Sequence, residues 1–255
     1  MKFYITEDDM CTTQKLNLAR VQKWIEANGH FVTSEIQESD KILCMTCNGW
    51  SLLEHASYDR INKYKKDFTD KMIVVGCVND AHPKRVQEIW NGPTVKTNSD
   101  QAYSFAEIEK YFPDFEIKLS NIPAQSIFRR KEDYRDYNLS KRFINIAEGC
   151  TFDCSFCTHK PGLGKPRSRS MKDILGQINN CVKEDVKIIN LMGMETSLWG
   201  RDIGSTYPKL LREVLNFNDS YEVHVAQFQP TGLYLYGEIL IDLFKLNTYI
   251  SEKVQ

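Results

Sequence analysis

Three cysteines follow one another closely in the run Cys150-Thr151-Phe152-Asp153-Cys154-Ser155-Phe156-Cys157. Thiolates are the usual ligands of 4Fe–4S clusters, and this spacing places three of them on one tight loop. No fourth thiol lies on the loop, so one iron would keep an open position for a small molecule, as catalytic metals do. A zinc site is the alternative, but zinc takes four tetrahedral ligands and only His159 is near enough to complete them. The spacing therefore favours an iron–sulfur cluster.

The first 115 residues, which precede this loop, alternate strand and helix patterns. Short apolar runs predict strands over 2–6, 30–34, 41–46 and 72–76, and helical patterns cover 14–28, 51–66 and 83–90. Such alternation predicts an α/β fold, with a flavodoxin- or Rossmann-like parallel sheet covered by helices on both faces.

Three more thiols follow strands of this predicted sheet. Cys11 comes after the first strand, Cys47 ends the strand at 41–46, and Cys77 closes the strand at 72–76. Open α/β sheets bind ligands at the carboxyl ends of their strands, so these thiols are candidates for a second cluster. Cys44 and Cys181 fit buried, hydrophobe-like cysteines better.

The run Cys44-Met45-Thr46-Cys47 also allows a different interpretation, a thioredoxin-type redox pair. That motif works from a helix N-terminus, which lowers the pKa of the attacking thiol. Cys44 instead lies within an apolar run, so the redox pair is the weaker hypothesis.

The whole pattern resembles the radical S-adenosylmethionine (SAM) methylthiotransferase family, whose members modify tRNA or a ribosomal protein. Thr46-Cys47 and Gly76-Cys77 are similar to the family's Asn-Thr-Cys and Gly-Cys signatures, with Met45 in place of the Asn. Around Cys11 the match departs from the family, with Met10 for Gly and Gln14 for Asn. The run 191–204, ending in Gly-Arg-Asp-Ile-Gly, is closest to the branch that modifies threonylcarbamoyl-adenosine beside the tRNA anticodon.

The resemblance implies two 4Fe–4S clusters and SAM as cofactors. Cys150, Cys154 and Cys157 would hold the SAM-cleaving cluster, and Cys11, Cys47 and Cys77 the auxiliary cluster that carries the sulfur to be transferred. Phe156 would pack near the adenine of SAM, and Gly193 and Glu195 would follow a barrel strand into the active site. Electrons would come from a donor such as flavodoxin or ferredoxin.

A basic stretch adjoins the cluster loop. Between Asp153 and Asp173 there is no carboxylate, and the candidate substrate contacts are Lys160, Lys165, Arg167 and Arg169. Glycines in this stretch predict a pliant loop, which would let the charges approach phosphates of a tRNA anticodon stem-loop. The alternative is an ordinary solvated loop.

We predict three segments: an N-terminal methylthiotransferase α/β domain over 1–115, a linker over 116–140, and a partial radical SAM barrel over 141–255. Strands at 142–147, 186–192 and 221–226 and helices at 171–186, 208–216 and 238–245 make about three βα units, against eight in a complete barrel. The resemblance implies about six units followed by a small C-terminal RNA-binding domain, so we expect the remaining strands and that domain to be missing from this sequence. We therefore expect an open edge strand, covered by a partner chain or by self-association.

Composition limits the other function classes. The chain has 255 residues, 42% hydrophobic and 26% charged, with a net charge of −1. An early acidic run and the lack of a stretch of about 18 apolar residues favour a cytoplasmic protein without membrane spans. We predict a methylthiotransferase that modifies a tRNA adenosine next to the anticodon. The alternatives are methylthiolation of a ribosomal protein or peptide, and a non-catalytic iron–sulfur scaffold or sensor.

Overall fold

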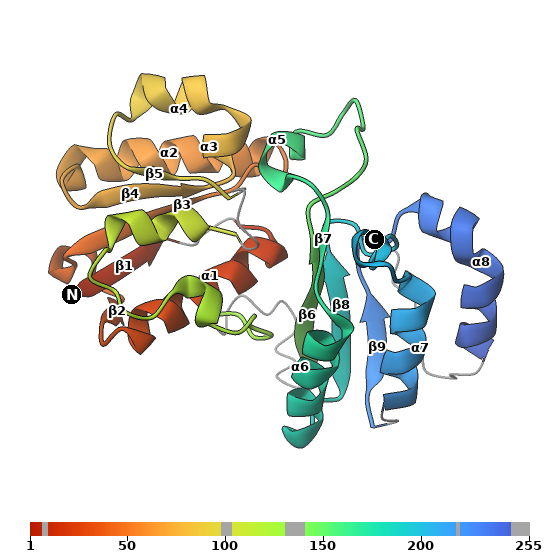
Figure 1. Ribbon diagram of the computed structural model, residues 1–255. Helices are drawn as coiled ribbons and strands as arrows, with labels where there is room; N and C mark the ends of the chain where they lie inside the picture. Colours follow the sequence, from red (N-terminus) through yellow and green to blue (C-terminus); the bar gives the residue numbers. More distant parts are fainter. Residues whose placement is uncertain (7–9, 98–103, 131–140, 218–219, 246–255) are drawn as a thin grey trace. The chain divides into compact units, whose positions relative to one another are not determined.

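A computed structural model describes residues 1–6, 10–97, 104–130, 141–217 and 220–245 (Figure 1). Contacts group the chain into two units, and each unit consists of two separate segments of the sequence. The first unit is Met1–Ala124 with Phe152–Gly164, and the second is Gln125–Thr151 with Lys165–Gln255. Both units combine strands and helices, which confirms the predicted α/β class.

The first unit contains a five-stranded, fully parallel sheet. Its strands are β1 (Lys2–Thr6), β2 (Phe31–Thr33), β3 (Lys41–Thr46), β4 (Met72–Gly76) and β5 (Thr94–Val95), in the order β2-β1-β3-β4-β5. This is the flavodoxin-like order, whose topological switch point lies between β1 and β3. The sheet confirms the predicted parallel architecture, and β5 adds a strand that the sequence pattern does not reveal.

Helices cover both faces of this sheet, because the strands are apolar on both sides. On one face, α1 (Thr12–Ala27) packs with the segment 105–122 over side chains such as Phe3 and Leu43. On the other face, α2 (Ser51–Phe68), α3 (Val78–Ala81) and α4 (Pro83–Ile89) pack over Ile42 and Val74 (Figure 1).

The segment predicted as a linker, 116–140, begins inside the first unit. The indole Nε1 of Trp24 donates to the carbonyl of Ile117 at 2.7 Å, and Leu119 is fully buried. Residues 131–140 of this predicted linker lie outside the described residues. The domain boundaries themselves stay a prediction.

The second unit contains a four-stranded sheet in the order β7-β6-β8-β9. β6 (Lys141–Glu148), β8 (Ile188–Gly193) and β9 (Glu222–Val225) are parallel, and β7 (Arg167–Ser168) pairs antiparallel with β6. The core on the sheet includes side chains of α6 (Met171–Lys183), α7 (Tyr207–Phe217) and α8 (Pro230–Lys245). This curled sheet with its three helices is a partial barrel, as predicted, and β9 lies at its edge.

Two local predictions are wrong. α8 begins at Pro230 instead of residue 238, although proline is favoured at a first helical position. The basic stretch after Cys157 is not an extended pliant loop, because it contains α5 (Lys160–Leu163) and β7. Short 3-10 helices lie at Ile36–Glu38, Ala106–Tyr111, Leu119–Asn121 and Arg201–Ile203. In the described part of the chain, no helix is both long and apolar enough to cross a membrane.

Candidate metal centres

The thiols of Cys11, Cys47 and Cys77 converge at one edge of the first sheet. Cys11 is the residue before α1, Cys47 directly follows β3, and Cys77 directly follows β4. Cys47 interacts by hydrogen bonds with both other thiols. They therefore meet at the carboxyl ends of the strands, beside the switch point where this fold type binds its ligands.

Neighbouring polar side chains hold two of these residues in place. The sulfur of Cys77 accepts hydrogen bonds from Gln14 Nε2 at 3.2 Å and from Thr97 Oγ1 at 3.4 Å. The hydroxyl of Ser57 accepts from the backbone N–H of Cys47 at 2.9 Å. These supporting residues were not found from the sequence. Gln14 lies one helical turn after Cys11, which was a usable signal, whereas Thr97 and Ser57 gave none.

The charge state of the three thiols reflects their contact. The hydrogen bond with Cys47 lowers the pKa of the Cys11 thiol and outweighs burial, which acts in the opposite direction. The hydrogen bond with Cys11 raises the pKa of Cys47 to about 12. The bond with Cys47 also raises the pKa of Cys77 well above its ordinary value. The Cys11 thiol therefore loses its proton more readily than the thiols of Cys47 and Cys77. Such a split in pKa is typical of thiols that lie close together, because one thiolate disfavours a second one beside it.

The donor set fits an iron–sulfur cluster better than a single metal ion. Among the described residues, no three His, Cys, Asp or Glu side chains are arranged to hold one ion. Cys77 donates a hydrogen bond to Cys47 and Cys47 donates one to Cys11, and the charge of Cys77 also acts on Cys11, so the three sulfurs are close neighbours. A single ion requires that its ligands share a centre. In a cluster, by contrast, each thiolate binds its own iron.

The second thiol set lies on the segment that crosses between the two units. Cys154 and Cys157 belong to the first unit, where the N–H of Cys157 donates to the carbonyl of Cys154 at 3.0 Å. Cys154 is exposed and Cys157 is half-buried. Cys150 belongs to the second unit and is half-buried. All are free thiols, as iron ligation requires.

In the second unit, Gly193 and Glu195 lie where β8 ends. A Cβ at Gly193 would stand 2.9 Å from the carbonyl of Ala147, so glycine allows β6 and β8 to approach closely. Glu195 is 5% exposed, and its Oε1 accepts hydrogen bonds from the N–H and the hydroxyl of Ser197. Its Oε2 is buried and has no hydrogen-bond partner among the described residues. Burial raises the pKa of this carboxyl, against the opposing effects of Ser197 and of the backbone N–H groups of Gln229 and Leu198.

An orphaned, buried carboxylate oxygen is costly unless a ligand completes it, so Glu195 has the features of a binding residue for a cationic group. Phe156, in the first unit, is 85% exposed and has the open ring face that stacking on a heteroaromatic ring requires.

The four basic residues predicted to contact the substrate differ in how their side chains are bonded within the protein. Arg169 donates to the carbonyl of Asn145 at 2.7 Å and to Gln177 at 2.8 Å, and Arg167 forms an ion pair with Glu148 at 3.7 Å. Lys160 donates to the carbonyl of Phe152. Lys165 is exposed. Both arginines thus have structural roles within the second unit, and substrate contact by the four residues stays a prediction.

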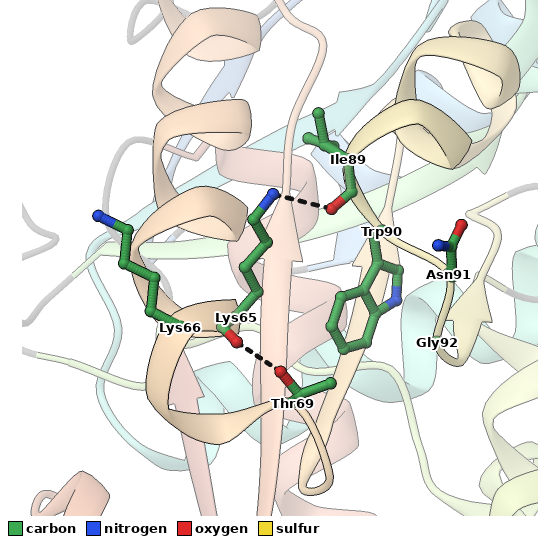
Figure 2. A pocket seen from close by; sticks show the side chains of 7 residues that line it. All are labelled: Lys65, Lys66, Thr69, Ile89, Trp90, Asn91 and Gly92. Carbon is green, nitrogen blue, oxygen red and sulfur yellow. Dashed lines mark hydrogen bonds between the residues drawn. The ribbon is translucent and has the colours of Figure 1, made fainter.

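The described residues also form a cavity of about 490 Å³ at the ends of α2 and α4, lined by Lys65, Thr69, Ile89 and Trp90 among others (Figure 2). Lys65 Nζ crosses it to the carbonyl of Ile89 at 3.0 Å. Thr69 precedes β4, so the cavity lies at the amino ends of the strands. The thiols lie at the opposite edge, and the cavity therefore has no part in their site.

The chain is similar to several known proteins. Residues 7–95 match a family model described as "Uncharacterized protein family UPF0004". The ribosomal protein uS12 methylthiotransferase RimO of Thermotoga petrophila is 24% identical over 241 residues, covering 91% of this chain and 54% of that protein. A probable threonylcarbamoyladenosine tRNA methylthiotransferase of Pyrococcus horikoshii is 26% identical over 250 residues, covering 96% of this chain and 57% of that protein. The chain thus spans about half the length of the curated relatives it matches.

Among solved structures, the chain is similar to the radical S-adenosylmethionine methyltransferase TsrM of Kitasatospora setae. The structure with tryptophan and a SAM analogue bound has a TM-score of 0.61 at 13% identity, covering 95% of this chain and 56% of that one. The structure of the same enzyme with cobalamin and a [4Fe-4S] cluster has a TM-score of 0.57 at 12% identity, covering 98% and 68%. At this identity the likeness concerns the fold.

Proposed function

We propose that this chain is a member of the radical SAM methylthiotransferase family and takes part in inserting a methylthio group into a C–H bond of a tRNA adenosine next to the anticodon. The observation that carries the proposal is the convergence of Cys11, Cys47 and Cys77 at the switch point of the first sheet. A radical SAM enzyme that needs a single cluster would have no use for this second set of thiols.

Each thiol set has a distinct task in this proposal. Cys150, Cys154 and Cys157 hold the cluster whose open iron takes SAM, and Cys11, Cys47 and Cys77 hold the auxiliary cluster. With SAM, the two clusters would supply the methyl group, the sulfur and the abstraction of the substrate hydrogen that methylthio insertion requires. The protein's own part is to position these groups and to exclude competing reactions.

Three further residues would bind SAM. Glu195 offers a buried carboxylate oxygen to the ammonium group, which would satisfy the acceptor that otherwise lacks a partner. Gly193, which ends β8 beside β6, would line the same site. Phe156 presents its ring to the adenine. An external donor such as flavodoxin or ferredoxin would supply the electron.

The tRNA substrate is supported by the run Gly200–Gly204. Gly200 and Gly204 adopt left-handed conformations with φ of 92° and 69°, and Asp202 accepts from the N–H of Ser168 at 2.8 Å. This anchored turn carries the sequence that resembles the tRNA-modifying branch. Ribosomal-protein methylthiolation is the second candidate, because relatives named for each substrate are similarly identical to this chain. A non-catalytic scaffold is the third, since β9 pairs with β8 alone among the described strands.

The test is iron and sulfide content after anaerobic reconstitution. Wild type is compared with two triple variants, Cys150/Cys154/Cys157→Ala and Cys11/Cys47/Cys77→Ala. About eight irons in wild type and about four in each variant are expected, at four per cluster. About four irons in wild type, lost entirely from the first variant, would refute the auxiliary cluster.

A second assay separates the substrates. The reconstituted chain is incubated with SAM and a reductant, together with either a tRNA anticodon stem-loop or a ribosomal-protein peptide. Mass spectrometry of each then shows which one gains a methylthio group. Formation of 5′-deoxyadenosine without either product would favour another substrate, and its absence would favour the scaffold.

A further inference from the structure

Two hydrogen bonds join the loop after β3 to the loop that carries Cys154 and Cys157. Nδ2 of Asn48 donates to the carbonyl of Thr158 at 2.8 Å, and Oγ1 of Thr158 donates back to the carbonyl of Asn48 at 3.3 Å. Both residues belong to the first unit. Asn48 directly follows Cys47, and Thr158 directly follows Cys157. The link therefore joins the residues next to one candidate ligand of each cluster.

The link runs from a buried residue to an exposed one, Thr158. Asn48 is 1% exposed. A Cβ at the next residue, Gly49, would stand 3.5 Å from His159 Nε2, so this residue also lies beside the loop of Cys154 and Cys157. On the other loop, the turn between Cys154 and Cys157 is closed by its own backbone hydrogen bond. The loop of Cys154 and Cys157 is thus linked to the loop of Cys47 by one side-chain hydrogen bond from each loop.

Asn48 is not simply a well-satisfied loop residue. Its Oδ1 is buried and has no hydrogen-bond partner among the described residues. Because an unsatisfied buried acceptor costs stability, a purely structural link would be better served by a side chain without that atom. What the asparagine provides is an N–H donor of fixed length, directed across the gap between the two loops.

We propose that Asn48 is a positioning residue, which fixes the loop of Cys154 and Cys157 against Cys47 before any cluster binds and so sets the separation of the two clusters. The inference rests on the proposed function, because the separation matters only where both clusters form. A fixed separation would let a radical made at one cluster act on a substrate that also faces the sulfur of the other.

The test compares Asn48→Ala with three other variants. Thr158→Val removes the hydroxyl donor, and Thr158→Ser keeps it. Asn28→Ala is the matched control, because Asn28 also bridges two segments of the first unit. Its Nδ2 donates to the carbonyls of Trp24 and Ile117 at 2.9 and 3.1 Å, at the helix end away from Cys11.

Hydrogen–deuterium exchange of the metal-free protein is the first readout. We expect amide exchange across residues 154–163 to accelerate at least about tenfold in Asn48→Ala, since opening then breaks fewer bonds. Thr158→Val should show a smaller increase, and Thr158→Ser and Asn28→Ala none in this segment. Unchanged exchange in Asn48→Ala would overturn the proposal, whether or not clusters load.

Electron paramagnetic resonance of the reduced, reconstituted protein is the second readout. Wild type and Asn48→Ala should contain the same iron, but the magnetic interaction between the two clusters should be weaker or heterogeneous in the variant. An identical interaction would contradict the positioning role while leaving the proposed function standing. A wild type that binds one cluster would instead refute the proposed function, and this outcome is read directly from the iron content.

Discussion

Replacing Glu195 with glutamine should stabilise the SAM-free protein and weaken its binding of SAM. In the structure, Oε1 accepts from the N–H of Ser197 at 2.8 Å and from its hydroxyl, while Oε2 is buried and has no partner within the described part of the chain. Glutamine keeps an oxygen for Ser197 and removes the charge. The variant therefore measures the free-energy cost of burying the charge, while the hydrogen bonds from Ser197 are kept.

The magnitude follows from the orphaned atom. A buried polar group without a partner costs about 1–3 kcal/mol, and only part of this is recovered by a neutral amide, so we expect Glu195→Gln to gain about 1 kcal/mol at pH 8. For domains of 150–250 residues, this corresponds to a rise in Tm of roughly 2–4 °C.

The gain should depend on pH. Burial raises the pKa of the Glu195 carboxyl above its ordinary value of 4.5, so the unfolded chain loses this proton first as the pH rises. Wild type therefore loses stability between pH 4.5 and the pKa of the folded state, and the variant does not. The difference in Tm should be largest at pH 8 and should shrink toward pH 4.5.

The assay is a pair of thermal melts at pH 5 and pH 8, followed by SAM titration of the reconstituted protein by calorimetry. A hydrogen bond to a charged group contributes about 1.5–3 kcal/mol, so the Kd for SAM should rise roughly 10- to 100-fold. Glu213→Gln, at an exposed position of α7, is the control and should change neither quantity. A variant that is less stable at pH 8, or that binds SAM as wild type does, would refute the reasoning.

Three further predictions concern stability and are checked by urea unfolding. Ser57→Ala should cost about 1–3 kcal/mol, because it leaves the buried N–H of Cys47 without its acceptor, and an unchanged midpoint would contradict this role. Gly149→Ala should lower the free energy of unfolding more than Gly204→Ala does. Both glycines have positive φ, but a Cβ at Gly149 would lie 2.1 Å from a backbone carbonyl and one at Gly204 would meet nothing within 4 Å, so equal losses would refute the steric argument. Ser170→Ala should cost about 0.5–2 kcal/mol, since its hydroxyl caps α6, and a loss outside this range would show another role.

The sequence predicts the first sheet well because its strands are short apolar runs, each followed by a turn or a cysteine. The strands at Lys2–Thr6, Lys41–Thr46 and Met72–Gly76 agree with prediction to the residue. β5, β7 and α5 were missed, because two-residue strands and a four-residue helix have no periodicity of their own. Such short elements form where a neighbouring element supplies backbone hydrogen bonds, as β6 does by pairing with β7.

The convergence of the three thiols could be predicted, because parallel strands bring their carboxyl ends to one edge. The residues that support them could not. Thr97 lies 20 residues after Cys77 and reaches its sulfur only through the fold. Arg169 shows that a sequence can also suggest too much. It was a candidate for substrate contact, but its guanidinium donates hydrogen bonds to Asn145 and Gln177.

The interleaving of the two units constrains how such a protein can be cut or recombined. The first unit needs Phe152–Gly164, which lies beyond 27 residues that belong to the second. A fragment ending at Ala124 would lose the partner of Asn48 and uncover α3, against which Gly162 packs with Asp80 3.5 Å from its Cβ position. If residues 1–124 were exchanged between relatives by a single crossover, Cys47 would come from one parent and the loop of Cys154 and Cys157 from the other. Chimeras should retain an intact first unit only when both segments come from the same parent.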